Sequence, residues 1–316
     1  MDKKCLHNFG DEKKVRKSMF LSPKADITFK KVFGEHPDIV KSFLNAMLPL
    51  EGREIVEIEY LTPELFPDAV EQKNSIVDVR CKDGEGRQFI VEMQMYWRKE
   101  MYERMVFNMA KVYSSQLNIG NTYQELKPIY GLCLLDDIAN NEEEFYHHLR
   151  ISTSDNKIVL DDFHLVLVEL PKFKPKTYAE KKLRVLWLRF LTEINEQTDE
   201  MPEDMKEDPS LNKALSILQV TGLNNKERLG YDKFVDAVCW QRTLMRGARE
   251  DGIEEGKKLG VEEGKRLGVE EGKKLGVEEG LEQGKLEMAR KMKQENMPVE
   301  VIQRVTGLTE KEIANL

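Results

Sequence analysis

The segment from Ser75 to Met95 predicts a β-hairpin whose pairing follows from its own sequence. Two runs rich in β-branched and apolar residues flank Asp83-Gly84-Glu85-Gly86-Arg87, a glycine-containing loop of the kind that closes hairpins. Symmetry about Glu85 gives three apolar cross-strand pairs: Val77 with Met93, Val79 with Val91, and Cys81 with Phe89. One face of the hairpin is therefore apolar and suited to cover a core.

The opposite face of the predicted hairpin places two carboxylates across from each other. Asp78 lies opposite Glu92, and Gln94 points the same way two residues further along. Like charges directly opposite in a sheet are destabilising, so the pair needs a cation, and a hard divalent metal ion with oxygen ligands would supply one. Arg80, diagonally across from Glu92, could instead neutralise the pair as part of an ordinary solvated face. The residues alone favour neither interpretation.

This arrangement resembles the PD-(D/E)XK nuclease superfamily, in which an Asp at the end of one strand precedes Glu-x-Lys or Glu-x-Gln on the antiparallel neighbour. Three segments are more specifically similar to the Rpn family of recombination-promoting nucleases, a transposase-like group: Lys24–Gly34, Ser75–Arg80 and Phe89–Gln94. The similarity covers most of the chain, including a glycine-rich tail.

The resemblance implies a DNA endonuclease that uses Mg²⁺, with Mn²⁺ as a substitute ion. Asp78 and Glu92 would hold the metal, which lowers the pKa of water and polarises the phosphoryl oxygen. Gln94 stands where most of the superfamily has Lys, and it would orient the attacking water. A glutamine can form hydrogen bonds but carries no positive charge, which lowers the expected activity without excluding it.

Asp26 is a further acidic candidate, located where a loop that begins with Ser22-Pro23 runs into an amphipathic helix. The resemblance matches Asp26 to the acid that the first core helix often contributes to the metal site, whereas local rules fit a helix N-cap equally well. Pro67-Asp68 is a literal Pro-Asp dipeptide, but it falls in a loop-like stretch rather than on the paired strands. Asp68 is therefore left out of the site.

The order of predicted elements matches the αβββαβ core of the superfamily, an α/β fold with a mixed sheet. The predicted elements are helices near 26–34 and 37–47, strands near 54–60, 75–82 and 88–96, a helix at 98–117, and strands near 128–135, 145–152 and 162–170. The helix after the hairpin carries Arg104 and Lys111 on a polar face, which fits either phosphate contacts or plain solvation. Fold alone does not assign a function.

Five parts follow along the chain: an N-terminal extension (1–20), the nuclease core (21–171), a helical region (172–250), a repeat tail (251–284) and a small three-helix unit similar to a helix-turn-helix (285–316). In the last part, Thr309 and Glu312 form a capping box. Because the second helix of this unit, which would read DNA, is acidic, DNA reading and protein interaction or oligomerisation are equally good interpretations.

Glycine returns every fourth residue of the repeat tail, from Gly252 to Gly284. Glutamates precede basic residues by four, as Glu262 precedes Arg266, and such pairs favour a helix by ~0.2–0.5 kcal/mol each. Each interior glycine opposes a helix by ~1 kcal/mol. An isolated tail is thus expected to be frayed, unless helices of a partner, including a second copy of the chain, pack closely on its glycines and bury its Leu and Val side chains.

Composition limits the remaining choices. The formal net charge of -8 counts against a DNA binder, because affinity for nucleic acid comes largely from Lys and Arg. Four scattered cysteines without CxxC spacing indicate neither a zinc site nor a disulfide framework. No apolar segment approaches the length of a membrane span, so we predict a cytoplasmic protein without a membrane partner.

Three hypotheses therefore stand. The first is a Mg²⁺-dependent DNA endonuclease of the recombination-promoting type. The second is a non-catalytic DNA-binding or protein-interaction module that retains the nuclease fold, which Gln94 and the acidic net charge favour. The third makes the repeat tail the functional part, as an assembly device.

Overall fold

The computed structural model describes residues 20–65, 75–174, 182–220 and 223–316, so Pro67-Asp68 lies outside the described residues. The chain divides into two compact units, Met1–Trp240 and Gln241–Leu316, and each is described by itself. Within the described ranges no helix is long and apolar enough to cross a membrane.

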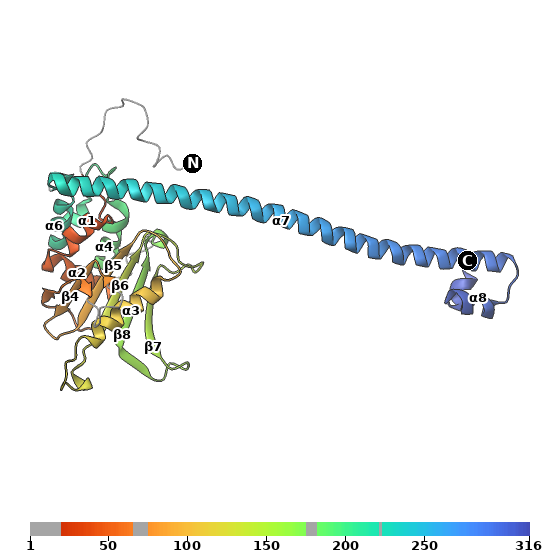
Figure 1. Cartoon of the computed structure of the whole chain (residues 1–316), viewed down its shortest axis with the longest axis horizontal. Coiled ribbons are helices and arrows are strands. Elements are labelled where there is room, and N and C mark those ends of the chain that lie inside the picture. The colour runs from red at the N-terminus through yellow and green to blue at the C-terminus, as the bar shows by residue number, and fades with distance from the viewer. Residues whose placement is uncertain (1–19, 66–74, 175–181, 221–222) are drawn as a thin grey trace, which may run out of the picture. The chain divides into compact units, whose positions relative to one another are not determined.

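A six-stranded mixed sheet in the order β1-β4-β5-β6-β8-β7 forms the centre of the first unit (Figure 1). Its strands are β1 (Ile58–Tyr60), β4 (Val79–Asp83), β5 (Gln88–Gln94), β6 (Ile129–Leu135), β7 (Tyr146–Ser152) and β8 (Val159–Glu169). Strands β5, β6 and β8 are parallel, and the other three pairings are antiparallel. The predicted α/β class with a mixed sheet is confirmed.

The hairpin register predicted from symmetry about Glu85 is confirmed for β4 and β5, where Val79 pairs with Val91 and Cys81 with Phe89. The predicted continuous strand 75–82 is wrong. The chain bends at Asp78, and residues Ser75–Ile76 form a separate strand, β3, which pairs with β2 (Glu64–Leu65).

The bend at Asp78 has a local cause. The Asp78 carboxylate accepts a hydrogen bond from the backbone N–H of Met93 at 2.8 Å, which gives that donor a side-chain acceptor in place of a ladder carbonyl. Val77 donates its own N–H to the Pro63 carbonyl at 3.1 Å. The consequence is that Val77 packs in a different apolar cluster from Val79 instead of sharing one face with it.

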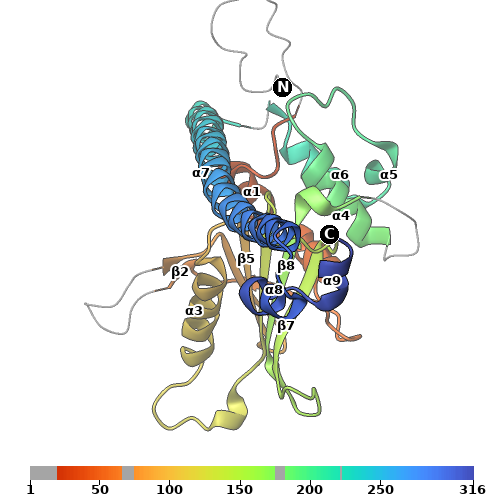
Figure 2. The ribbon, with the colours of Figure 1, turned by 90° about the vertical axis from the view of Figure 1, so that its right-hand side faces the viewer.

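Helices cover both faces of the sheet (Figure 2). The helices whose residues enter the larger core cluster are α1 (Asp26–Phe33), α2 (Pro37–Met47), α4 (Lys182–Glu193), the short α5 (Glu203–Lys206) and α6 (Pro209–Ile217). The other face is covered by α3 (Met101–Ser114), whose Met105 and Met109 pack with Ile90 of β5. Because side chains alternate along a strand, Phe89 and Val91 enter the larger cluster while Ile90 faces α3.

Aromatic rings join the later helices to the first two. Trp187 of α4 is fully buried and lies 5.8 Å from Phe33 of α1 and 5.4 Å from Phe43 of α2, measured between ring centroids. These helices therefore contribute to the same core as the sheet. They hold α1 against the sheet, and α1 carries residues of the candidate site.

Two predicted elements are shorter in the structure. The strand expected near 54–60 begins only at Ile58, because both backbone groups of Ile55 are bound by the Asn45 side chain, its N–H by Oδ1 at 2.8 Å and its carbonyl by Nδ2 at 2.9 Å. The helix expected at 98–117 spans Met101–Ser114.

The repeat tail is helical in the structure. Helix α7 runs without a break from Asn225 to Gln294, which differs from the frayed segment expected for an isolated tail. Ion pairs along the helix favour it, such as Lys258 with Glu254 at 2.8 Å and Lys274 with Glu270 at 3.5 Å. The apolar side chains of the repeat remain between 50% and 64% exposed, namely Leu259, Val261, Leu267, Val269, Leu275 and Val277.

The C-terminal residues form α8 (Val299–Thr306) and α9 (Glu310–Ala314). A small apolar cluster joins both to the end of α7 through Ala289, Ile302 and Ile313. The predicted capping box of Thr309 and Glu312 is present at the start of α9. Gly307 ends α8 in the left-handed conformation with φ 76°, as glycine readily does.

Candidate active site

Glu92 is a buried carboxylate on the face of β5 that α3 covers. Its side chain is 3% exposed, and its Oε2 atom accepts hydrogen bonds from Gln94 Nε2 at 2.8 Å and from Arg104 Nη2 at 2.9 Å. Its Oε1 atom is buried and has no hydrogen-bond partner within the described part of the chain. A buried acceptor without a donor is costly, so Oε1 is the atom of this site best suited to a further ligand.

Asp78 occupies the bend between β3 and β4. One of its oxygens accepts the hydrogen bond from Met93 N–H, and the other lies 3.8 Å from Lys30 Nζ. Lys30 also approaches Asp26 Oδ1 at 2.6 Å. The ammonium of Lys30 thus lies between an acid of its own helix and the acid at the bend.

Burial dominates the electrostatics of both sheet carboxylates. Burial, with a smaller contribution from the neighbouring charge of Asp78, raises the pKa of Glu92 to about 7 against the lowering effect of Arg104. Burial likewise raises the pKa of Asp78, against the hydrogen bond from Met93 and the charge of Lys30. The two groups therefore resist simultaneous ionisation, as two adjacent acids do when no metal ion is bound between them.

The hairpin sequence suggests Arg80 as the cation beside Asp78 and Glu92, but other residues occupy that place. Arg80 donates to Gln88 Oε1 at 3.1 Å, and the cations that approach Glu92 and Asp78 are Arg104 of α3 and Lys30 of α1. The sequence indicates only the pairing of Lys30 with Asp26, because these two residues are four apart on one predicted helix. Which strand residue each cation would reach depends on how the helices dock, which the sequence pattern does not reveal.

Asp26 is not an N-cap. Ala25 caps α1, and Asp26 is the first residue of the helix, with its side chain 57% exposed and paired with Lys30. Among the described residues no group of three or more His, Cys, Asp or Glu side chains could hold a metal ion. The structure therefore does not bring Asp26 together with Asp78 and Glu92 as a preformed set of three ligands.

Two lysines, one just before α1 and one within it, form ion pairs with acids at the ends of strands. Lys24 Nζ lies 2.7 Å from an oxygen of Asp136, which directly follows β6, and Lys30 reaches Asp78. The backbone N–H of Asp136 donates to the carbonyl of Gln94 at 2.8 Å. Asp136 is thus an acid beside the site that no sequence motif selects, because its proximity to Gln94 arises from the parallel pairing of β5 and β6.

The carboxylates of Asp78 and Glu92, including the Oε1 atom of Glu92 that is unpartnered among the described residues, fit a divalent cation. Carboxylate oxygens are the ligands that Mg²⁺ prefers, and this ion commonly takes only one or two carboxylates with water completing its shell. The donor set is therefore adequate for Mg²⁺ without a third protein ligand.

A mixed sheet with an Asp at a bend, a buried Glu on the adjacent strand and helices on both faces is consistent with a core of the PD-(D/E)XK type. The model of the PD-(D/E)XK nuclease family transposases matches residues 23–246, and the chain belongs to that family. Comparisons with curated proteins and with solved structures gave no match. The resemblance noted in the sequence is confirmed at the level of this family.

Proposed function

We propose that this protein is a metal-dependent DNA endonuclease that hydrolyses phosphodiester bonds, of the recombination-promoting type. The observation that carries the proposal is the buried Glu92 beside Asp78, with one carboxylate oxygen left without a donor among the described residues, in a chain of a nuclease family. Mg²⁺ is the proposed ion and Mn²⁺ its substitute. The substrate is DNA, and the cytoplasm is the proposed location.

Asp78 and Glu92 would hold the metal ion, with Asp26 available at the edge of the site once Lys30 releases it. When bound, the ion supplies a Lewis acid for the phosphoryl oxygen and lowers the pKa of water. It also favours the ionised form of both carboxylates, which opposes the effect of burial on their pKa values.

Gln94 would orient the water that attacks phosphorus. Its amide nitrogen is engaged by Glu92 at 2.8 Å, so its amide oxygen is the atom that can accept a hydrogen bond from water. The amide oxygen of Gln94 can orient a water molecule by accepting its hydrogen bond. It carries no positive charge, so it cannot offset the negative charge that develops on the phosphoryl group.

The positive charge that Gln94 lacks would come from Lys30 and Arg104. Lys30 is 43% exposed beside Asp78, and Arg104 is 44% exposed above Glu92, so both can face a substrate phosphate. Fixed cations next to a developing negative charge stabilise it without reorganisation of water. Supply of this charge from α1 and α3 accounts for a Glu-x-Gln strand in an active nuclease.

A second candidate is a non-catalytic DNA-binding module with the same fold. The observation that favours it is that the described residues include no preformed group of three metal ligands. Such a module would retain DNA without metal and would not break it.

Incubation of supercoiled plasmid with the purified protein distinguishes the two candidates. The nuclease predicts nicked or linear products with Mg²⁺ or Mn²⁺ and none with EDTA, and loss of these products in Asp78→Asn. Retarded but intact plasmid in both conditions, from protein with a normal circular dichroism spectrum, would favour the binding module.

A further inference from the structure

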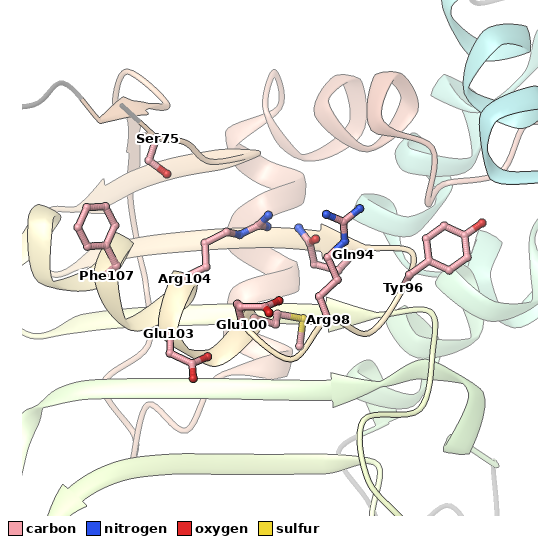
Figure 3. A pocket seen from close by; sticks show the side chains of 9 residues that line it. Ser75, Gln94, Tyr96, Arg98, Glu100, Glu103, Arg104 and Phe107 are labelled. Atoms are coloured by element: carbon pink, nitrogen blue, oxygen red, sulfur yellow. The ribbon is translucent and has the colours of Figure 1, made fainter. Parts of the chain in front are cut away.

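A cavity of about 560 Å³ lies beside the candidate site (Figure 3). The end of β5, the following loop and one side of α3 form its walls, and Gln94 and Arg104 of the site line it directly. Its volume lies within the range of pockets that bind small ligands. A group bound in this cavity would therefore be adjacent to Glu92.

Two guanidinium groups enter this cavity. Arg104 gives one N–H to Glu92 and keeps others available, and Arg98 is exposed with no ion-pair partner in the described part of the chain. Figure 3 shows both side chains directed toward the region of Gln94. Arginine binds phosphate well because its planar fork can donate two parallel hydrogen bonds.

Aromatic rings supply apolar walls. Phe107 of α3 is 43% exposed, which is high for a phenylalanine, and Lys111 Nζ lies 5.5 Å from its ring centroid. Tyr96 is fixed by a hydrogen bond from its hydroxyl to the Val238 carbonyl at 2.6 Å. An exposed ring next to arginines offers a stacking surface for a nucleobase.

Glu100 and Glu103 line the same cavity and restrict what it can bind. They would repel the phosphates of a duplex laid across it, whereas a carboxylate can accept hydrogen bonds from the amino group of a base. Cationic, aromatic and acidic groups in one cavity therefore match a nucleotide with its phosphate near Arg98 and its base near Phe107 and Glu103.

We propose that this cavity binds one unstacked nucleotide of the DNA strand next to the phosphate that is cleaved. Arg98 contacts its phosphate, Phe107 stacks on its base, and Glu103 accepts a hydrogen bond from a base amino group. This inference rests on the proposed function, and it adds a substrate class: single-stranded or locally unpaired DNA. A base in a closed duplex would first have to leave its stack, which costs free energy.

Fluorescence anisotropy with a labelled single-stranded oligonucleotide and the matching duplex tests this proposal, with Ca²⁺ in place of Mg²⁺ so that binding is read separately from cleavage. Full-length protein is expected to bind the single strand more tightly than the duplex. Phe107→Ala should lose about tenfold in affinity for the single strand, Phe107→Trp should restore it, and duplex affinity should change little. Val106→Ala, an exposed neighbour outside the cavity, is the matched control.

Arg98→Ala should also weaken binding of the single strand more than Lys99→Ala, which removes a neighbouring positive charge that does not line the cavity. Equal losses for both oligonucleotides, an unaffected Phe107→Ala, or a wild-type protein that does not prefer the single strand would each overturn the proposal. If wild type cleaves plasmid with Mg²⁺ while any of these results holds, the nucleotide site fails and the nuclease stands. Selective binding of the single strand without plasmid cleavage would support the nucleotide site and count against the nuclease.

Discussion

At the residue scale, the proposed chemistry depends on Glu92, a carboxylate that the fold buries without providing hydrogen bonds to both of its oxygens. Glu92 has donors for one oxygen and none for the other among the described residues. A core position of this kind lowers the stability of the metal-free protein, and binding of a divalent ion would relieve that cost.

This cost should appear as a dependence of stability on pH in EDTA. Burial raises the pKa of Glu92 from an ordinary value of 4.5 to about 7, so the folded state holds its proton more tightly than the unfolded state. The stabilising contribution of that proton is full below pH 4.5 and is lost as the pH rises through 7, with a difference on the order of 3 kcal/mol. Asp78 acts in the same direction.

Denaturant unfolding of the wild type and of Glu92→Gln from pH 5 to pH 8 measures this effect. Glu92→Gln should gain stability relative to wild type as the pH rises, because its amide stays neutral. A constant difference between the two proteins across this range would contradict the raised pKa of Glu92.

Lys30 provides a second prediction at this scale. Lys30→Met should lower the cleavage rate by about 10–100-fold, because it removes a fixed positive charge beside the reacting phosphate. Lys31→Met on the same helix is the matched control, since Lys31 pairs with Glu227 at 2.8 Å instead. Single-turnover rates on a labelled oligonucleotide report the chemical step, and equal rates for the two variants would exclude this role of Lys30.

The residues of the site differ in how far the sequence could predict them. Hairpin symmetry is a local property, so the sequence by itself is enough to predict the β4–β5 register, next to which Asp78 acts electrostatically on Glu92. The partners Lys30 and Arg104 come from helices whose contacts with the strands depend on packing over long sequence distances. Local pattern rules do not contain that information.

At the scale of the element, the broken strand at Asp78 and the repeat helix depart from local expectation. The apolar alternation around Val77 continues through the bend, so periodicity alone predicts one strand. Pairing of β3 with β2 instead of β5 is a tertiary outcome. For the repeat, the glycines oppose a helix by more than the ion pairs favour it, so propensity alone predicts a frayed tail, whereas the structure has one continuous helix.

The glycines of α7 also lack a straight common face. Positions four residues apart differ by about 40° around a helix with 3.6 residues per turn, so the row of glycines winds slowly around the axis. A partner that packs on all of them would have to wind with it. This geometry separates the repeat from an ordinary heptad coiled coil.

A glycine substitution tests whether α7 is helical in solution. A Cβ added at Gly264 or Gly272 meets no atom within 4 Å, so Gly264→Ala with Gly272→Ala should stabilise the local helix by ~1 kcal/mol per site. Hydrogen exchange of the full-length protein should slow within the repeat and stay unchanged in the sheet. Exchange that remains as fast as in wild type would indicate that the repeat is not helical.

At the scale of the whole molecule, the order of elements predicted an α/β core with a mixed sheet, and this much was predictable because each strand and helix has its own periodicity. What the order could not specify is that α4 and α6 complete the core on α1 and α2, with Trp187 among the rings of Phe33 and Phe43. Those contacts join segments far apart along the chain. No local signal identifies such partners.

The division into two units predicts that cleavage and assembly are separable. All proposed site residues lie in the first unit, and the exposed apolar repeat lies in the second. A chain that stops before Asp251 should retain metal-dependent cleavage and lose any oligomeric mass that the full chain shows in light scattering. Loss of cleavage from a folded, truncated protein would show that the repeat contributes to the site.

Metal-dependent catalysis at Glu92 is tested most sharply by the rate of plasmid cleavage in Mg²⁺ by Glu92→Gln compared with Glu59→Gln. Glu59 lies on β1 of the same sheet, and its exposed side chain pairs with Lys82 at 3.0 Å, so its substitution controls for the loss of one carboxylate. We predict a loss of at least about 100-fold for Glu92→Gln, by removal of a metal ligand, and a rate near that of wild type for Glu59→Gln. Metal-dependent cleavage at the wild-type rate by Glu92→Gln would contradict a nuclease site built on this carboxylate.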